Sequence, residues 1–571
     1  MTKNKPRVMV MGLDGATFKN LTPWMEEGLL PNLKFLVENG ASGELESTIP
    51  RLSSPAWTSF MTGVNPGKHG IFAFFKAYHD KRFGKELVTS TDIKAKTVME
   101  ILSEYGKICV SVNLPMTYPP FKINGVMVGC GLTTPSTDFD FTYPNDLLDK
   151  IGIKKSDYIL NIEARYYAED KYEGFFRDLT KETEQKKEVG LKLMEYVDWD
   201  FLTIVFGGTD RLHHFYWHHI DKTHSRYNPQ KAEKIRPFII DYYKKLDSIV
   251  GEFINKIDEQ TSIFIMSDHG FGNLEKKVAI DNILKRNKLL VPNNSSLKRS
   301  TTKTLHLIRG FLNQNLFLYR KLKSLIKIGR EKFQKRLLKK IISKKRVEKR
   351  LSNIADGYWQ KINWKKTLAS KGISDNSVYL NLAGRNPEGI IKTEEKRSEV
   401  SNKIIAIIKN LKDPETKQPL KVNTYKKEEI YSGPYIDSAP ELFFEIEDGS
   451  YKFFSIEDEE EFFEKPLKLS GTHTKYGIVI GYGNNLKKAQ TIQNAQITDL
   501  VPTILYLLGI PIPKNLDGKV LKDGIADNYL RENTIQYGKT EENERFNRES
   551  DPNFKTDTKK IEERLANLGY I

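Results

Sequence analysis

The chain has 571 residues, of which 29% are charged and 39% hydrophobic, an ordinary composition for a soluble protein with a large core. No apolar run approaches the roughly 18 residues that a membrane-spanning helix needs, and no export signal is visible at the N-terminus. Residues 298–350 hold 19 lysines and arginines against two acids, which accounts for the whole net charge of +16, so the overall charge does not predict a nucleic-acid partner.

Strand-like and helical stretches alternate through the first half of the chain. Short apolar runs predict strands at Arg7–Asp14, Ile108–Val112, Val126–Cys130, Phe201–Gly207 and Ser262–Ser267. Helices are expected at Pro31–Asn39, Phe175–Tyr196 and Lys231–Asp258. This alternation predicts an α/β fold of the doubly wound kind, with a mostly parallel sheet and helices on both faces.

The second half is divided by a basic segment. Residues 291–354 begin with a loop signal and continue with apolar residues at helical spacing. Strand-like runs return at Val378–Leu382, Leu442–Ile446 and Gly477–Gly481, a helix is expected at Ile497–Leu508, and a charged helix at Thr558–Leu568. We therefore expect a catalytic domain in two parts, 1–290 and 355–528, a basic helical insertion at 291–354 and a polar tail at 529–571.

The chain has two cysteines, Cys109 and Cys130, and both lie in apolar runs. This placement predicts buried free thiols without a disulfide, as is usual in a reducing compartment. We therefore expect a cytoplasmic protein.

Acidic residues close three of the predicted strands. Asp14 follows the first, Asp210 follows the run that starts at Phe201, and Asp268 is followed directly by His269. The carboxyl ends of parallel strands line one crevice. On a helix, His214 would share a face with Asp210, four residues earlier. Alone, each pattern also fits a turn or a cluster of packed histidines, but together they indicate a metal site.

A second candidate stretch runs from Thr48 to Gly63. Ser53 and Ser54 stand just before Pro55, where a helix is expected to begin. A hydroxyl at a helix N-terminus lies among backbone N–H groups that favour an anion. Taken alone, this stretch is more typical of a helix in which Ser53 or Ser54 is only the N-cap.

These motifs, with Pro66–Gly70, Gly471–His473 and Ile497–Leu505 in the same order, resemble the alkaline phosphatase superfamily in its type I phosphodiesterase/nucleotide pyrophosphatase branch. The resemblance covers residues 7–290 and about 355–525. It implies an alkaline-phosphatase-like fold and a phosphohydrolase that acts through a phosphoseryl intermediate.

The resemblance also implies two metal positions. Asp210, His214 and His473 would hold one ion, and Asp14, Asp268, His269 and the nucleophile Ser53 would hold the other. Mixed nitrogen and oxygen donors favour Zn²⁺, with Mn²⁺ as the alternative. Two such ions can stabilise the attacking and leaving oxygens of an in-line displacement.

The sequence departs from well-known members of the branch near the nucleophile. Many nucleotide pyrophosphatases have Thr at the position of Ser53 and an Asn shortly afterwards, and no Asn follows here before Gly63. The backbone N–H of Ser54 or the side chain of Arg211 is the expected phosphate donor, although Arg211 also fits a salt bridge. Trp57 replaces the Arg that sulfatases need, which argues against formylglycine chemistry.

The sequence constrains the substrate and the partners less closely than it constrains the metal site. We expect a small phosphate ester, or a lipid or glycan phosphodiester, and no specific nucleic-acid partner. The basic residues 298–350 fit a solvated cap, an amphipathic element on an anionic membrane, or a site for a phosphate-rich polymer. A phosphomutase, and a non-catalytic membrane-surface protein on the same fold, are the alternatives.

Overall fold

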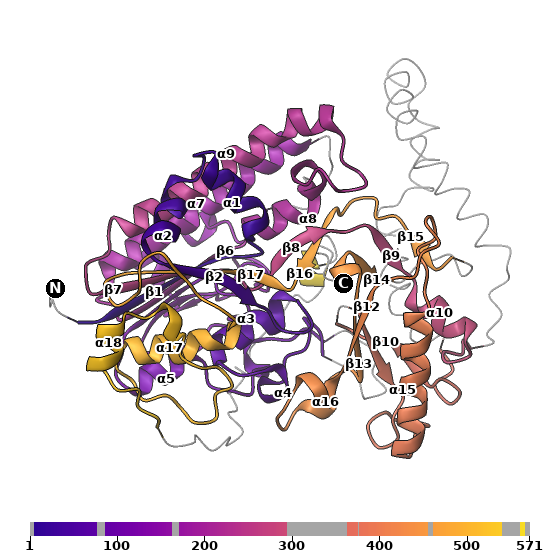
Figure 1. Ribbon diagram of the computed structural model, residues 1–571. Coiled ribbons are helices and arrows are strands. Elements are labelled where there is room, and N and C mark those ends of the chain that lie inside the picture. The colour runs from indigo at the N-terminus through magenta and orange to yellow at the C-terminus, as the bar shows by residue number, and fades with distance from the viewer. Residues whose placement is uncertain are drawn as a thin grey trace, which may run out of the picture.

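The computed structural model describes residues 5–76, 86–162, 171–293, 362–374, 376–454, 461–538, 560–562 and 564–565. Within them, a ten-stranded sheet forms the centre of the main lobe (Figure 1). Its strands lie in the order β18 (Gln490–Thr491), β2 (Ala41–Glu46), β17 (Tyr476–Tyr482), β7 (Thr261–Met266), β1 (Arg7–Leu13), β6 (Phe201–Phe206), β3 (Cys109–Val112), β4 (Gly125–Val128) and β5 (Thr142–Tyr143), with β19 (Ala495–Gln496) also paired to β2.

The five strands β7, β1, β6, β3 and β4 run parallel to one another. β17 is antiparallel to both β2 and β7, and β5 is antiparallel to β4. Every residue of β6 and β7 is buried, because helices cover both faces of the sheet. The expected α/β fold with a mostly parallel sheet is therefore confirmed.

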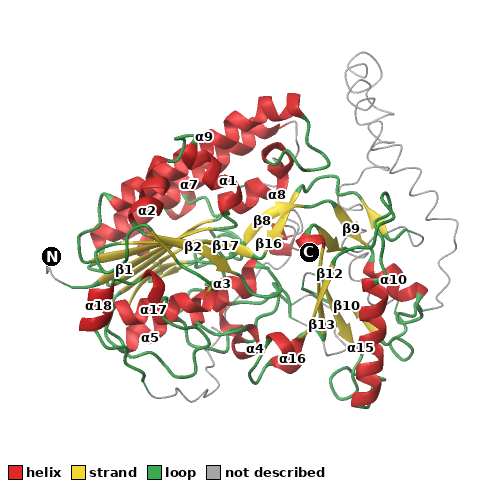
Figure 2. Ribbon diagram, in the orientation of Figure 1, coloured by secondary structure: helices red, strands yellow, loops and turns green. Residues whose placement is uncertain are grey.

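Helices form a layer on each face of this sheet (Figures 1 and 2). One layer contains α1 (Phe18–Glu26), α2 (Pro31–Asn39), α7 (Tyr172–Tyr196), α8 (Gly208–Ile220) and α9 (Pro229–Ile254). The other contains α3 (Ser53–Thr62), α5 (Val98–Glu104), α17 (Leu500–Leu507) and α18 (Asp527–Glu532). The helices predicted at 31–39, 175–196, 231–258 and 497–508 all occur, with boundaries shifted by a few residues at most ends.

A second sheet has its own hydrophobic core beside the main lobe (Figure 2). Its strands lie in the order β10 (Ala369–Lys371), β11 (Ser377–Leu380), β13 (Leu442–Ile446), β14 (Tyr451–Phe453), β9 (Lys276–Val278) and β15 (Phe463–Glu464), with β12 (Val422–Lys426) also paired to β13. α10 (Ile280–Arg286) and α15 (Glu394–Lys409) supply buried residues to its core. We call the described residues between 276 and 464 the second lobe.

The expected second part of the catalytic domain, 355–528, thus divides between two sheets. Strands β10 to β15 belong to the second lobe, whereas β17, β18 and β19 return to the main sheet. Between them, β16 (Gly471–Thr474) pairs with β8 (Gly270–Asn273) in a two-stranded sheet. The connection from residue 464 to 476 therefore passes from one lobe to the other.

Three other expectations can be compared with the described residues. Cys109 and Cys130 are buried free thiols, as expected. Of the basic insertion expected at 291–354, only residues 291–293 are described, and most of the helix expected at 558–568 also lies outside the described residues. Among the helices that the structure describes, none has the length and apolar character needed to cross a bilayer.

Candidate metal centre

The three acids at strand ends meet at one edge of the main sheet. β1 lies between β6 and β7, and Gly12 is in register with Val205 on one side and Met266 on the other. Asp14 directly follows β1, Asp268 lies two residues after β7, and Asp210 lies four residues after β6 in the first turn of α8, so the sheet brings their carboxylates together. In Figure 1, α3, α8, β8 and β16 lie at the end of this sheet that faces the second lobe.

One group of ligand atoms consists of Asp210, His214 and His473, all buried. α8 begins directly after β6, so Asp210 and His214 lie one turn apart on it. β16 supplies His473, and Asp210 Oδ1 lies 3.4 Å from His214 Nε2 and 3.2 Å from His473 Nε2. The two Nε2 atoms are 3.0 Å apart. These are the three residues that the family resemblance assigns to the first metal position.

The other group surrounds His269, which precedes β8. His269 Nε2 lies 3.7 Å from Asp14 Oδ1, 3.3 Å from Asp268 Oδ2 and 3.4 Å from Ser53 Oγ. Ligand atoms of Asp14, Asp210 and His269 fall within 4.8 Å of one another. Asp210 therefore stands between the two groups, and the seven expected ligands come together in one site.

The three histidines present the same nitrogen to this site. Each Nδ1 donates to a backbone carbonyl: His214 to Gly471 (3.2 Å), His269 to Gly270 (3.1 Å) and His473 to Arg51 (2.7 Å). Burial lowers the pKa of His473 to about 4, with the charge of Lys452 acting in the same direction, and burial together with His473 lowers the pKa of His269 well below its usual range. In the neutral rings of His269 and His473 the proton lies on Nδ1, and the Nε2 lone pair points toward the carboxylates, as in a metal ligand.

The carboxylates complete a donor set suited to cations. Burial, and then the charges of Asp268 and Asp210, raise the pKa of Asp14, while burial raises the pKa of Asp268 to about 7. Burial would also raise the pKa of Asp210, but His214 and His473 outweigh it and hold that pKa well below its usual range. Asp14 Oδ1 and Asp268 Oδ2 are buried and accept no hydrogen bond from the residues that the structure describes. Buried carboxylates facing imidazole lone pairs fit divalent metals with mixed nitrogen and oxygen ligands.

Ser53 is the first residue of α3 and does not act as its N-cap. The N-cap position is Leu52, without a side-chain hydrogen bond, so the simple capping interpretation does not describe Ser53. Its hydroxyl instead faces His269. Ser54 Oγ is buried and makes no hydrogen bond to a described residue, and the Ser54 N–H belongs to the first turn, before the helical hydrogen bonds begin.

Three residues that were not expected as metal ligands, Trp57, His213 and Phe271, contact the ligands or the backbone beside them. Trp57 Nε1 donates to Asp14 Oδ2 at 3.1 Å, and a Cβ at Gly12 would lie 2.5 Å from the Trp57 ring, so only glycine admits this contact. His213 contacts the carbonyl of Gly15 through Nδ1 (3.2 Å) and accepts from Tyr243 through Nε2 (2.7 Å). The Phe271 ring packs against His213, His214 and His473. Trp57 stands four residues after Ser53 on α3, which is the one sequence signal that pointed to it.

Arg211 lies beside Asp210 in sequence but forms a buried ion pair. Its Nη1 donates to Glu182 Oε2 of α7 at 2.5 Å, and Lys186 also lies 3.4 Å from Glu182. We expected Arg211 either to bind phosphate or to form a salt bridge, and the structure shows the salt bridge. Its role in substrate binding stays a prediction.

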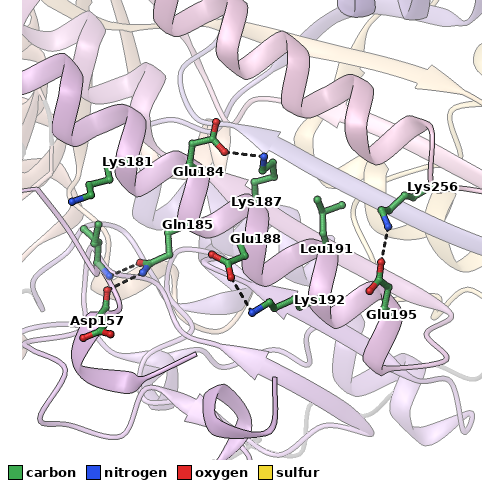
Figure 3. A pocket seen from close by; sticks show the side chains of 11 residues that line it. Asp157, Lys181, Glu184, Gln185, Lys187, Glu188, Leu191, Lys192, Glu195 and Lys256 are labelled. Carbon is green, nitrogen blue, oxygen red and sulfur yellow. Dashed lines mark hydrogen bonds and ion pairs between the residues drawn. The ribbon is translucent and has the colours of Figure 1, made fainter. Parts of the chain in front are cut away.

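A surface hollow of about 830 Å³ lies along α7, away from the candidate metal centre (Figure 3). Its lysines and glutamates pair with one another, as in Lys187–Glu184 and Lys256–Glu195. None of the expected site residues lines it. The positive and negative side chains of this hollow largely neutralise one another, so its lining favours neither an anion nor a cation.

Two solved structures are similar to this chain at low sequence identity. Human ectonucleotide pyrophosphatase/phosphodiesterase 5 gives a TM-score of 0.46 at 12% identity, covering 90% of this chain and 98% of its own. Phosphonoacetate hydrolase from Sinorhizobium meliloti 1021, solved with phosphonoformate, gives a TM-score of 0.46 at 14% identity. The match covers 89% of this chain and 96% of the hydrolase chain. At this level neither structure assigns a substrate to this chain. No curated protein sequence matches significantly.

The profile of one protein family matches most of the sequence. It is described as type I phosphodiesterase/nucleotide pyrophosphatase and covers residues 8–474. This span contains the whole candidate metal centre, from Asp14 to His473. The chain therefore belongs to the type I phosphodiesterase/nucleotide pyrophosphatase family of phosphoric ester hydrolases.

Proposed function

We propose that the protein is a metal-dependent phosphodiesterase that uses Ser53 as its nucleophile. The observation that supports this most directly is the position of Ser53 Oγ, 3.4 Å from His269 Nε2 and at the margin of two ligand groups that share Asp210. We propose two divalent ions, with Zn²⁺ favoured by three imidazole donors and Mn²⁺ as the alternative.

The chain's own residues would perform the following steps. Ser53 Oγ attacks phosphorus, the P–O bond to one alcohol breaks, and that alcohol departs while a phosphodiester to Ser53 remains. Water then cleaves the bond to Ser53 and releases a phosphomonoester. Bound metal ions would lower the pKa of the attacking hydroxyl and offset the charge that develops on the oxygens. The N–H groups at the start of α3 are oriented to bind a phosphoryl oxygen.

The substrate range follows from the same proposal. We propose small phosphate esters, or lipid or glycan phosphodiesters, as substrates. A cytoplasmic location, with peripheral contact of residues 298–350 to an anionic inner membrane surface, stays part of this proposal and has its own test below.

Hydrolysis of bis-p-nitrophenyl phosphate by protein purified without chelators tests the proposal. Activity should disappear with the metal content on chelation and return with Zn²⁺ or Mn²⁺. Asp210→Asn should lose metal and activity together, because Asp210 stands between both ligand groups. Asp221→Asn is the matched control at the end of the same helix, where Asp221 pairs with Lys19 instead. Full activity of metal-free protein would refute the proposal.

A further inference from the structure

We infer that the cavity between the second lobe and the segment before Ser53 binds a small anionic group on the departing alcohol, held by Arg51 and Lys452. The inference rests on the proposed function and extends it to a substrate class: phosphodiesters whose leaving alcohol carries a carboxylate or a second phosphate.

The second lobe is attached directly to the chain segment that leads into the nucleophile. Tyr431 Oη donates to the carbonyl of Ile49, and the Arg51 guanidinium pairs with Glu445 of β13. The Arg51 carbonyl accepts from His473 Nδ1 at 2.7 Å. Arg51 thus links the second lobe, the start of α3 and a candidate metal ligand within one set of contacts.

A cavity of about 50 Å³ lies at this junction. Its wall includes Arg51, Tyr425, Phe443, Glu445, Lys452 and His473. His473 belongs to the ligand group of Asp210 and His214, whereas the Ser53 hydroxyl lies 3.4 Å from His269 Nε2 in the other group. In an in-line displacement the leaving oxygen departs opposite to the attacking oxygen. The cavity therefore lies on the side toward which the alcohol leaves.

The polar groups of this wall favour an anion. Glu445 already accepts from Arg51, from Asn423 Nδ2 (3.3 Å) and from Tyr425 Oη (3.3 Å). Arg51 Nε is buried and makes no hydrogen bond to any residue in the described part of the chain. Lys452 of β14 is only 9% exposed and faces the same cavity. A guanidinium N–H and an ammonium on one wall form charge-assisted hydrogen bonds with a carboxylate or phosphate.

The size of the cavity limits the group that it accepts. A cavity of about 10–15 Å³ in this measure holds one water molecule, so about 50 Å³ admits a few heavy atoms. This is the scale of a carboxylate or a compact phosphate group.

The test compares binding of 3-hydroxypropanoate and its neutral isostere 3-hydroxypropanamide to the metal-loaded protein by titration calorimetry, which needs no turnover. We expect the acid to bind at least about tenfold more tightly, as charge-assisted contacts allow. Lys452→Met should abolish this preference and Lys452→Arg should keep most of it. Lys421→Met, at an exposed lysine of the same lobe paired with Asp448, should leave it unchanged.

Equal binding of acid and amide to the wild-type protein would overturn the inference without any variant. A preference that survives in Lys452→Met would also overturn it, because Lys452 would then contribute nothing to holding the anion. Hydrolysis of bis-p-nitrophenyl phosphate is measured on the same samples. If that ester is hydrolysed but the acid is not preferred, this inference alone fails. If the acid is preferred without hydrolysis, the anion site stands and the proposed function fails.

Discussion

Replacing Trp57 by Phe removes one contact to a candidate metal ligand while keeping an aromatic ring in the core. Trp57 is fully buried, and its Nε1 donates to Asp14 Oδ2 at 3.1 Å. A hydrogen bond to a charged acceptor is worth about 1.5–3 kcal/mol. At about 1.4 kcal/mol per factor of ten, its loss should weaken binding of the ion near Asp14 roughly 10- to 100-fold, the range found for partners of metal ligands.

The effect should grow as the pH falls. The Trp57 N–H lowers the pKa of Asp14, against the larger effects of burial and of the charges of Asp268 and Asp210, which raise it. Without this donor the Asp14 carboxyl holds its proton to a higher pH, and a metal ion must displace that proton. Competition with a calibrated zinc chelator at several pH values measures the loss.

Trp199→Phe provides the matched control. Trp199 is also buried, but it lies at the opposite end of β6, where Arg7 stacks on its ring at 5.4 Å. Both variants should lose some free energy of unfolding, measured with urea, because the smaller ring leaves unfilled space. Only Trp57→Phe should lose metal affinity. Equal metal affinity in both variants would refute this role of Trp57.

Three further outcomes follow. Ser53→Ala should lower turnover by several powers of ten, whereas Ser54→Ala, which keeps its backbone N–H, should stay active; the reverse result would mean that the nucleophile is misassigned. Burial raises the pKa of Asp268 to about 7, whereas the pKa of this carboxyl in the unfolded chain is near 3.9. The protonated carboxyl therefore stabilises the metal-free folded protein fully below about pH 3.9, and this stabilisation is lost as the pH rises to about 7. Between about pH 4.5 and pH 7.5, the free energy of unfolding of chelator-treated Asp268→Asn, measured with urea, should therefore rise by on the order of 3 kcal/mol relative to wild type. A difference between the two proteins that stays constant over this range would contradict the raised pKa. Deleting residues 297–350 should abolish sedimentation with anionic vesicles at low salt and leave the metal content unchanged, and equal sedimentation of both forms would favour a solvated cap.

Local sequence signals were sufficient to predict the five parallel strands of the main sheet and β17, but not β2, β5, β18 or β19. β1, β6 and β7 are short, wholly or almost wholly buried runs, and each is followed by the acid that the sequence marked. Their parallel order follows from the helices between them. β17 has the same apolar character but runs antiparallel, and its direction depends on pairing with β2, more than 400 residues away. Periodicity alone cannot show such a pairing.

The second lobe and the supporting contacts could not be read from local sequence. β9 pairs with β14 and β15, which lie well over 150 residues further on, and this sheet shares its core with segments on both sides of the insertion. The contact of Trp57 with Asp14 joins residues 43 positions apart, and that of Glu445 with Arg51 joins residues 394 apart. The ligand types were visible because chemistry restricts them, whereas the contacts that orient them depend on tertiary packing.

Anomalous diffraction at the zinc edge, from crystals of protein purified without chelators, tests the central claim most directly. The account predicts two peaks roughly 4 Å apart, one bounded by Asp210, His214 and His473 and the other by Asp14 and His269. Manganese would give the same two positions at its own edge. Crystals without an anomalous peak at these positions, or with a single peak elsewhere among the histidines of α8, would contradict the account.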